Sequence, residues 1–187
     1  RFDEDTPQAE TLGVYKDLLD EGKIRSIGAS NFDEGQLEDA LKIAETEGLP
    51  AYQVLQPEYS LVSRASFEGP LQRLCIDKNI GVVTYFSLAS GFLSGKYRSL
   101  DDLQGQARGG MAKKYIENGG LQVLEAMDDI ATSKNITLAE LAIAWLLHRD
   151  GVTAPIASAT KDSHLKSLVK ASEVSLTPEE VEALAVF

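Results

Sequence analysis

The chain has 187 residues, and its 18 basic and 29 acidic side chains give a formal net charge of -11. The length fits one domain, which we expect to span residues 1–187. The acidic surface disfavours nucleic acid and anionic membranes as partners. Cys75 is the single cysteine, which excludes an internal disulfide and a cysteine-rich metal site and favours a cytoplasmic protein. No apolar run approaches the ~20 residues that span a bilayer.

One local pattern recurs along the chain: a short apolar run, then polar residues, then a helical periodicity. A helix between Thr6 and Gly22 comes first, with no strand before it; Thr6 is expected to cap it and Pro7 to be its first residue. The four expected strands are residues 24–29, 51–55, 80–85 and 154–157. The helices expected after them cover residues 33–48, 67–79, 121–134 and 138–149, and two more begin at residues 162–163 and 177.

Several helix ends are marked by their cap residues. Asp33, Thr137 and Thr177 each stand where a side-chain oxygen can accept a hydrogen bond from the first helical turn, and Thr177 begins a capping box. Gly48 is expected to end the helix that Asp33 begins.

Apolar spacing indicates which helix faces are buried. Trp145 lies among aliphatic residues and is expected in the core, and His148 at the end of the same helix is expected to be structural. In the helix that begins at residues 162–163, the spacing predicts that Leu165, Leu168 and Val169 point inward.

The segment 87–120 differs from the other connections. It holds seven glycines and several basic residues. A connection of this length inside a compact domain is usually a lid, a binding loop or a disordered segment.

The repeated pattern predicts an α/β fold of the (β/α)8 TIM-barrel type, here about half a barrel. A complete barrel typically takes ~250 residues, whereas only four strand-helix units and a leading helix are found here. The chain begins with Arg1 and opens on a helix without its strand. We therefore expect that a segment upstream is missing, through truncation, processing or an incomplete record.

Polar residues follow the first two expected strands, where chemistry sits in a parallel β/α barrel. If neighbouring units pair in parallel, the exits that carry Ser30, Asn31 and Gln56 lie side by side. An amide side chain offers a donor and an acceptor and can therefore hold a planar carboxamide. The alternative is that Ser30 and Asn31 only cap the following helix.

The third strand ends in Tyr85, which can stack on a flat ring or fill the barrel end. The glycines that follow let backbone N–H groups approach a diphosphate, and Lys96 supplies charge. Taken alone, this signal is weak because glycine-rich loops are common.

The fourth strand runs into Ser158-Ala159-Thr160-Lys161 at a helix start. Hydroxyls, free N–H groups, the positive end of the helix dipole and an ammonium group converge there, which predicts a phosphate site. The alternative is a plain capped helix with a solvated lysine. His164 can add a phosphate partner, and neither histidine has the spacing of a metal site.

Four motifs occur in this order: Gly28-Ala29-Ser30-Asn31-Phe32, Gln56-Pro57-Glu58-Tyr59, Ser87-Leu88-Ala89-Ser90-Gly91-Phe92-Leu93-Ser94-Gly95-Lys96-Tyr97 and Ala157-Ser158-Ala159-Thr160. Together they resemble the C-terminal half of the barrel of the aldo-keto reductases. The resemblance covers nearly the whole chain.

The resemblance implies a cofactor, NADP(H) or less often NAD(H), extended over the barrel mouth. The nicotinamide carboxamide would be held by Ser30, Asn31 and Gln56, and Tyr85 would stack on the ring. The pyrophosphate strap would be formed by Phe86, Ser87, Leu88, Ala89, Gly91 and Lys96. The ribose phosphate and the adenine end would be held by Ser158, Thr160, Lys161 and His164.

The sequence also departs from the family pattern. Phe86-Ser87 stands where many members have Ser-Pro, His164 falls where Arg or Gln is usual, and Leu168 falls where Asn often contacts the adenine. The last two differences leave the preference between NADP and NAD open, although Lys161 favours a 2′-phosphate. The family's catalytic Asp, Tyr, Lys and His lie on its first four strands, and none of those motifs occurs here.

We therefore expect the cofactor-binding half of an NADP(H)-dependent oxidoreductase that reduces an aldehyde or ketone, nearly inactive by itself. Two alternatives stay open: a non-catalytic nucleotide-binding regulatory subunit, as some relatives are beside membrane channels, and a phosphate-binding barrel lyase or isomerase. Half a barrel leaves two strand edges open, which predicts either a missing N-terminal half-barrel or self-association.

Overall fold

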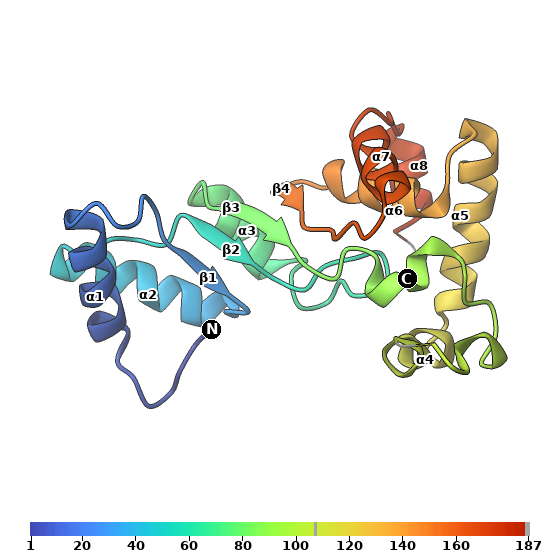
Figure 1. Ribbon diagram of the computed structural model, residues 1–187. Coiled ribbons are helices and arrows are strands. Elements are labelled where there is room, and N and C mark those ends of the chain that lie inside the picture. Colours follow the sequence, from blue (N-terminus) through green and yellow to red (C-terminus); the bar gives the residue numbers. More distant parts are fainter. Residues whose placement is uncertain (107, 186–187) are drawn as a thin grey trace.

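The computed structural model describes residues 1–106 and 108–185. Its strands form one parallel sheet in the order β1-β2-β3-β4 (Figure 1). The strands are β1 (Gly28–Ser30), β2 (Val54–Gln56), β3 (Gly81–Thr84) and β4 (Val152–Pro155). The α-helices are α1 (Gln8–Asp20), α2 (Glu34–Glu47), α3 (Pro70–Asp77), α4 (Gly109–Glu117), α5 (Gly120–Lys134), α6 (Leu138–Leu147), α7 (Asp162–Ala171) and α8 (Pro178–Ala183).

Each strand pairs in parallel with the strand that follows it in the chain. Gly28 lies opposite Val54, Val54 opposite Gly81, and Val82 opposite Val152. Because all four strands run the same way, their carboxyl ends meet at one edge of the sheet. The predicted α/β architecture of successive strand-helix units is therefore confirmed.

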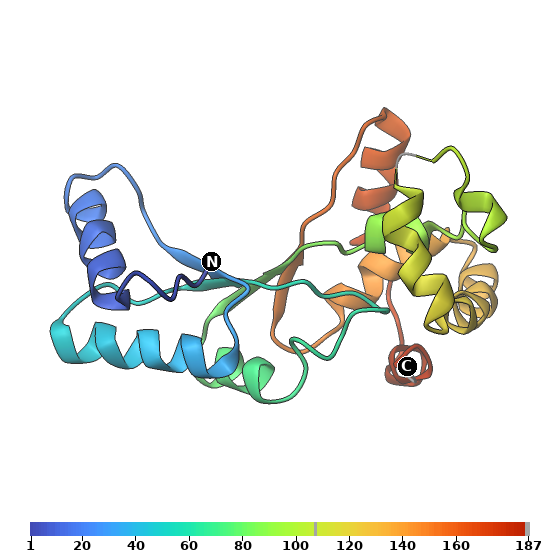
Figure 2. The same ribbon diagram turned by 90° about the horizontal axis from the view of Figure 1, so that it is seen from below.

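Most helices gather around the two ends of this sheet. Figures 1 and 2 show α1 and α2 on the β1 side and α4 to α8 on the β4 side, while α3 lies against the sheet near β2 and β3. One connected apolar core, which includes Leu12, Leu55, Phe92 and Trp145, runs through both groups. Within the described residues, β1 and β4 each have one neighbouring strand, so the expectation of a further half-barrel or a second copy at these edges stays a prediction.

The limits of all four strands differ from those predicted. Pairing in β1 begins at Gly28 rather than residue 24, and pairing in β2 begins at Val54 rather than residue 51. The fourth strand lies earlier, at Val152–Pro155 instead of residues 154–157. Apolar runs report burial, whereas strand limits depend on where the neighbouring backbone comes within hydrogen-bonding reach.

The caps predicted at Asp33, Thr137 and Thr177 are confirmed, whereas the cap predicted at Thr6 is wrong, because α1 begins after Pro7 and its N-terminus has no side-chain cap. The side chains of Asp33, Thr137 and Thr177 accept hydrogen bonds from backbone N–H groups three residues on, and each forms a complete capping box. Gly48 ends α2 in the left-handed conformation, with φ of 66°. These helix ends could be predicted from the sequence because each depends on only four or five consecutive residues.

The predicted inward face of α7 is wrong. Leu165 is 58% exposed and Val169 is 55% exposed. The helix packs on α6 through polar contacts instead, where Ser167 Oγ donates to Glu140 at 3.0 Å and Lys170 Nζ lies 3.4 Å from the same carboxylate. Burial of the apolar stripe requires a neighbour on that side, and none is present among the described residues.

The segment 87–120 is folded rather than one irregular loop. It contains two 3-10 turns, Ala89–Ser94 and Asp101–Leu103, and then α4. The segment is fastened to the core by ring packing of Phe92 on Tyr115 at 5.6 Å. Arg98 adds two hydrogen bonds to Asp128 of α5, at 2.7 and 2.8 Å.

Two adjacent glycines in α4 test this packing. A Cβ on Gly109 would lie 2.3 Å from the carbonyl oxygen of Leu103, whereas a Cβ on Gly110 would meet nothing within 4 Å. We expect Gly109→Ala to lower the free energy of unfolding by about 1–3 kcal/mol through overpacking. Gly110→Ala should raise it by up to about 1 kcal/mol, because alanine favours the helix. Urea unfolding of both variants checks this, and equal effects at the two positions would contradict the described packing.

No single helix in the described part of the chain is long and apolar enough to span a membrane. The joined pair α5 and α6 meets the length and composition requirement, but its two helices are bent by 95° at their junction.

Candidate functional site

The polar residues predicted to bind a cofactor lie at the carboxyl ends of the four strands. Ser30 lies opposite Gln56 in the β1–β2 register, and the N–H of Asn31 donates to the carbonyl oxygen of Gln56 at 3.1 Å. Beyond β2 and β3, the N–H of Tyr85 donates to the carbonyl oxygen of Pro57 at 3.0 Å. Beyond β3 and β4, the N–H of Ile156 donates to the carbonyl oxygen of Thr84 at 2.7 Å. The strand exits therefore form a connected row.

Ser30, Asn31 and Gln56 lie together, as their positions in the sequence predicted. The alternative, that Ser30 and Asn31 cap α2, is not supported, because the cap is the side chain of Asp33. None of the three side chains is hydrogen-bonded to another residue of the described chain. Two amides and a hydroxyl are therefore available to a ligand at this edge, which fits a planar carboxamide.

Tyr85 follows β3 and is half-buried. Its ring packs on Phe86, with 5.2 Å between the ring centroids. Phe86 has φ of 54° and is 42% exposed, so an aromatic side chain projects from a tight turn at the strand end. An aromatic pair at this place can support a flat ring. Stacking of Tyr85 on a nicotinamide stays a prediction.

The predicted strap has buried side chains and an accessible charge. The side chains of Ser87 and Ala89 are buried, so only their backbone can face a ligand, and Leu88 is half-buried. Lys96 folds back over the strap: a Cβ on Gly91 would come 3.2 Å from its Nζ. A glycine is needed at position 91 for this approach and for a φ of 91°.

Backbone conformations that disfavour side chains are concentrated at this edge. Six non-glycine residues of the described chain have positive φ, and four of them follow β1 or β3: Asn31, Phe86, Ala89 and Ser90. The other two lie at the ends of α3 and α5. Left-handed backbone at ordinary residues costs of order 1 kcal/mol or more each, and it is typical of functional sites.

The fourth exit leads to the predicted phosphate site. Lys161 is the N-cap residue of α7 and supplies no side-chain cap. The hydroxyl of Thr160 lies 3.4 Å from Nδ1 of His164, and both residues are exposed, as are Ser158 and Lys161. The start of α7 thus presents an ammonium group, hydroxyls and the helix dipole, with Asp162 as an opposing charge.

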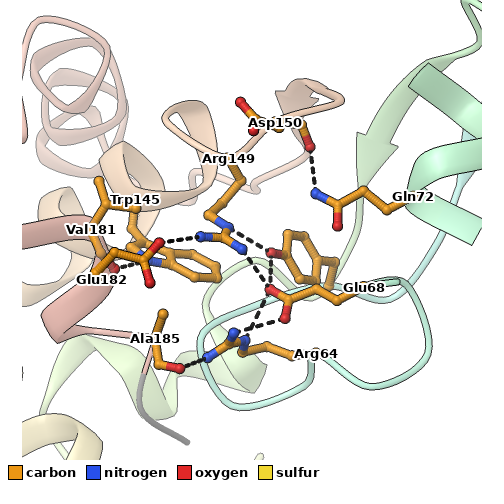
Figure 3. Close-up of polar contacts among 10 residues, drawn as sticks. Arg64, Glu68, Gln72, Trp145, Arg149, Asp150, Val181, Glu182 and Ala185 are labelled. Atoms are coloured by element: carbon orange, nitrogen blue, oxygen red, sulfur yellow. Dashed lines mark hydrogen bonds and ion pairs between the residues drawn. The ribbon is translucent and has the colours of Figure 1, made fainter. Parts of the chain in front are cut away.

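A second polar cluster, which the sequence did not reveal, lies behind the β2 exit (Figure 3). Glu68 accepts hydrogen bonds from Arg64 at 2.7 and 3.0 Å, from Tyr59 at 2.6 Å and from Arg149 at 3.2 Å. Both guanidinium groups also lie over the ring of Trp145, at 5.1 and 5.8 Å. The cluster joins the β2 exit loop to α6, and its members are far apart in sequence, which is why spacing gave no signal.

The same cluster holds the C-terminal region. The indole N–H of Trp145 donates to the carbonyl oxygen of Val181 at 3.2 Å, and Arg64 donates to that of Ala185. Burial tends to raise the pKa of Glu68, but the hydrogen bonds from Arg64 and Tyr59 outweigh it and hold that pKa below its ordinary value. Burial and the bond to Glu68 raise the pKa of Tyr59, so its hydroxyl stays protonated.

Other features of the described residues do not suggest a competing site. They contain no group of three or more His, Cys, Asp or Glu residues that could hold a metal ion. His148 has a structural role, as expected: one ring nitrogen lies 2.8 Å from the carbonyl oxygen of Ala144, and the other accepts from the N–H of Leu176. A cavity of about 320 Å³ lies between residues 61–65 and the α4–α5 corner, and none of the predicted cofactor-binding residues lines it.

Comparison with known proteins agrees with this arrangement. The sequence model of the Aldo/keto reductase family matches residues 1–186. A probable voltage-gated potassium channel subunit beta from Oryza sativa subsp. japonica is 31% identical, over 98% of this chain and 58% of its own length. An NADH-specific methylglyoxal reductase from Escherichia coli is 32% identical, over 92% of this chain and 51% of its own length. The aldo-keto reductase yakc [NADP(+)] from Schizosaccharomyces pombe is 31% identical, over 98% of this chain and 54% of its own length.

The fold agrees as well. The crystal structure of the thermostable aldo-keto reductase Tm1743 superimposes with a TM-score of 0.77 at 24% identity, covering 98% of this chain and 56% of its own. The chain spans about half the length of the curated relatives it matches. With the match extending from residue 1 to residue 186, the chain belongs to the aldo/keto reductase family.

Proposed function

We propose that this chain supplies the cofactor-binding strands of an aldo-keto reductase that uses NADP(H), or less readily NAD(H), to reduce an aldehyde or ketone. The observation that carries the proposal is the group of unengaged polar side chains at the β1 and β2 ends: Ser30, Asn31 and Gln56. These groups fit a carboxamide, and Lys161 follows the strand at the other end of the sheet, so an extended dinucleotide would cross all four strand ends.

The bound cofactor would supply a hydride to the carbonyl carbon of the substrate. The residues of this chain would bind and orient it. Asn31 and Gln56 would hold the carboxamide and thereby fix which face of the ring is presented, and Tyr85 would support the ring. We assign the proton donor to none of the residues of this chain, so we propose that the chain alone turns over little substrate.

The preference for NADP(H) is proposed from charge. The relatives themselves differ, since one is named NADH-specific and another carries NADP(+) in its name. A 2′-phosphate adds negative charge, which an acidic chain of net charge -11 binds only through a local cation. Lys161 at the start of α7 is that cation, with Thr160 and His164 beside it.

Binding and turnover measured together test the proposal. NADPH should bind saturably by isothermal titration calorimetry, while NADPH oxidation with a panel of aldehydes stays near background. Lys161→Met should weaken NADPH about tenfold and NADH less than twofold, because only NADPH loses a charge-assisted contact. The matched control is Lys166→Met, which removes another exposed lysine of α7 and should leave both affinities unchanged. Absence of saturable NADPH binding to the native chain would reject the proposal.

A regulatory, non-catalytic role is the second candidate. It is favoured by the relative named as a potassium channel subunit beta, from rice, and by a similar one from Arabidopsis thaliana. Both roles require dinucleotide binding, and aldehyde turnover by the intact parent protein separates them. Family membership gives the lyase or isomerase alternative no support.

A further inference from the structure

The hydroxyl of Ser87 joins two strand exits that are far apart in sequence. The side chain is 1% exposed, and its Oγ lies 3.0 Å from the carbonyl oxygen of Ile156 beyond β4. It also lies 3.2 Å from the carbonyl oxygen of Thr84 and 3.4 Å from the hydroxyl of the same residue. Ser87 therefore cannot offer its side chain to a ligand, although it lies within the predicted strap.

A serine hydroxyl carries one proton, so it donates to one carbonyl at a time. The carbonyl of Ile156 is the nearer acceptor, and the carbonyl of Thr84 already accepts from the N–H of Ile156 at 2.7 Å. The Thr84 hydroxyl can in turn donate to Ser87. This order gives a chain from Thr84 through Ser87 to Ile156, in which each hydrogen bond polarises the next.

This bond replaces a missing rung of the β3–β4 ladder. Thr84 lies opposite Pro155, so a regular parallel ladder would next join the N–H of Phe86 to the carbonyl oxygen of Ile156. Phe86 instead adopts φ of 54° and uses its own carbonyl to accept from Ala89. No Phe86–Ile156 bond is formed, and the Ser87 hydroxyl satisfies the Ile156 carbonyl in its place.

The two exits lead to two neighbouring parts of the proposed cofactor site, the pyrophosphate strap and the phosphate site at the start of α7. The β3 exit continues into the strap that carries Lys96, and the β4 exit continues into the start of α7 at Lys161. Both polar backbone groups of Ile156 are bound to the β3 exit, one through Thr84 and one through Ser87. Because these two bonds hold the peptide groups on both sides of Ile156, they fix its orientation as well as its distance, so the Ser87 hydroxyl limits how the two loops move relative to each other.

We propose that Ser87 is a positioning residue, whose hydroxyl holds the strap and the α7 start at the spacing that an intact dinucleotide requires. The proposal rests on the proposed function, because it concerns the same cofactor site. It predicts a particular signature: each half of the cofactor still binds its own loop, while the gain from linking the halves is lost.

The experiment compares the intact cofactor with its two halves. The probes are NADPH, reduced nicotinamide mononucleotide and adenosine 2′,5′-bisphosphate, titrated against the native chain and Ser87→Ala. We expect Ser87→Ala to weaken NADPH about tenfold and to change the affinity of either half less than twofold, because pre-set geometry acts only on the linked ligand. Ser87→Cys keeps the volume of the side chain but donates only weakly, so its NADPH affinity should lie between those of the native chain and Ser87→Ala.

Two controls separate positioning from general damage to the loop. Thr84→Val removes the neighbouring buried hydroxyl but leaves the Ser87–Ile156 bond. Ser94→Ala removes a hydroxyl of a residue that is not assigned to cofactor binding; it donates to the carbonyl oxygen of Gly91 at 2.7 Å and does not reach β4. Both should keep NADPH affinity within about twofold of the native value, and thermal unfolding confirms that all variants are folded.

The outcomes are distinct. If the native chain binds no NADPH, the proposed function fails before Ser87 is tested. If the native chain binds NADPH and both Ser87→Ala and Ser87→Cys bind it equally well, the positioning role is rejected. If Ser87→Ala weakens one half as much as it weakens NADPH, Ser87 shapes one loop only, and the proposal is likewise overturned.

Discussion

Glu68→Gln is expected to lower the free energy of unfolding by about 2–3 kcal/mol, somewhat less than removal of one partner of a fully buried ion pair, because the side chain of Glu68 is 21% exposed. The carboxylate accepts from Arg64 and Arg149, whose side chains are each only 16% exposed. Glutamine keeps the volume but leaves two guanidinium groups near each other without their shared anion (Figure 3). Urea unfolding followed by circular dichroism measures the loss.

Glu182→Gln is the matched control for this change. Its carboxylate lies 3.8 Å from Nη1 of Arg149, but its side chain is 76% exposed. An exposed pair contributes at most about 1 kcal/mol, so Glu182→Gln should be close to neutral. Equal losses in the two variants would mean that burial of the cluster does not decide its strength.

The Glu68 contribution also has a pH dependence of definite sign. The pKa of Glu68 is lowered in the folded chain, since the hydrogen bonds from Arg64 and Tyr59 outweigh burial. Its stabilisation is therefore fully present above the ordinary carboxyl pKa, about 4.3, and is lost as the pH falls through the lowered folded value. The stability difference between the native chain and Glu68→Gln should be constant near neutral pH and shrink below about pH 4.

Local patterns in the sequence were enough to predict the capped ends of α2, α6 and α8 and the row of strand exits, although they misplaced the starts of α1 and α3. Asp33 caps α2 through contacts that span three residues, and no distant partner decides that outcome. The neighbourhood of Ser30 and Gln56 followed from one assumption, that consecutive units pair in parallel. Consecutive strands are neighbours in roughly two-thirds of cases, so the strand exits could be placed together even though the predicted strand limits were inexact.

Contacts between distant segments could not be predicted in the same way. The bonds of Glu68 to Arg149 join residues 81 apart, and no spacing rule relates them. The exposed stripe of Leu165 and Val169 shows the converse failure, since the pattern is apolar but nothing among the described residues covers it. The sequence suggested that Ser87 binds the cofactor, because it lies in a glycine-rich strap. The structure shows that its hydroxyl points toward Ile156 instead.

Trp145 also joins distant segments, and its side chain is the largest of those that are fully buried in the described chain. The ring is fully buried, packs on Tyr59 at 5.6 Å between ring centroids and donates to the carbonyl oxygen of Val181. The guanidinium groups of Arg64 and Arg149 also lie over this ring. Its removal therefore takes away apolar burial, a buried hydrogen bond and the surface on which two cations stack.

Trp145→Ala is accordingly expected to lower the free energy of unfolding by about 3–5 kcal/mol. Trp145→Phe keeps most of the burial and should lose about 1–2 kcal/mol through the unpaired Val181 carbonyl. Leu147→Ala, at a 36% exposed position of the same helix, is the control and should cost far less. Because Trp145 is the single tryptophan, circular dichroism rather than fluorescence must follow the unfolding. Since Trp145 and Glu68 share both arginines, the double variant should lose less than the sum of the single losses; strict additivity would show that the ring and the carboxylate stabilise the C-terminal region independently.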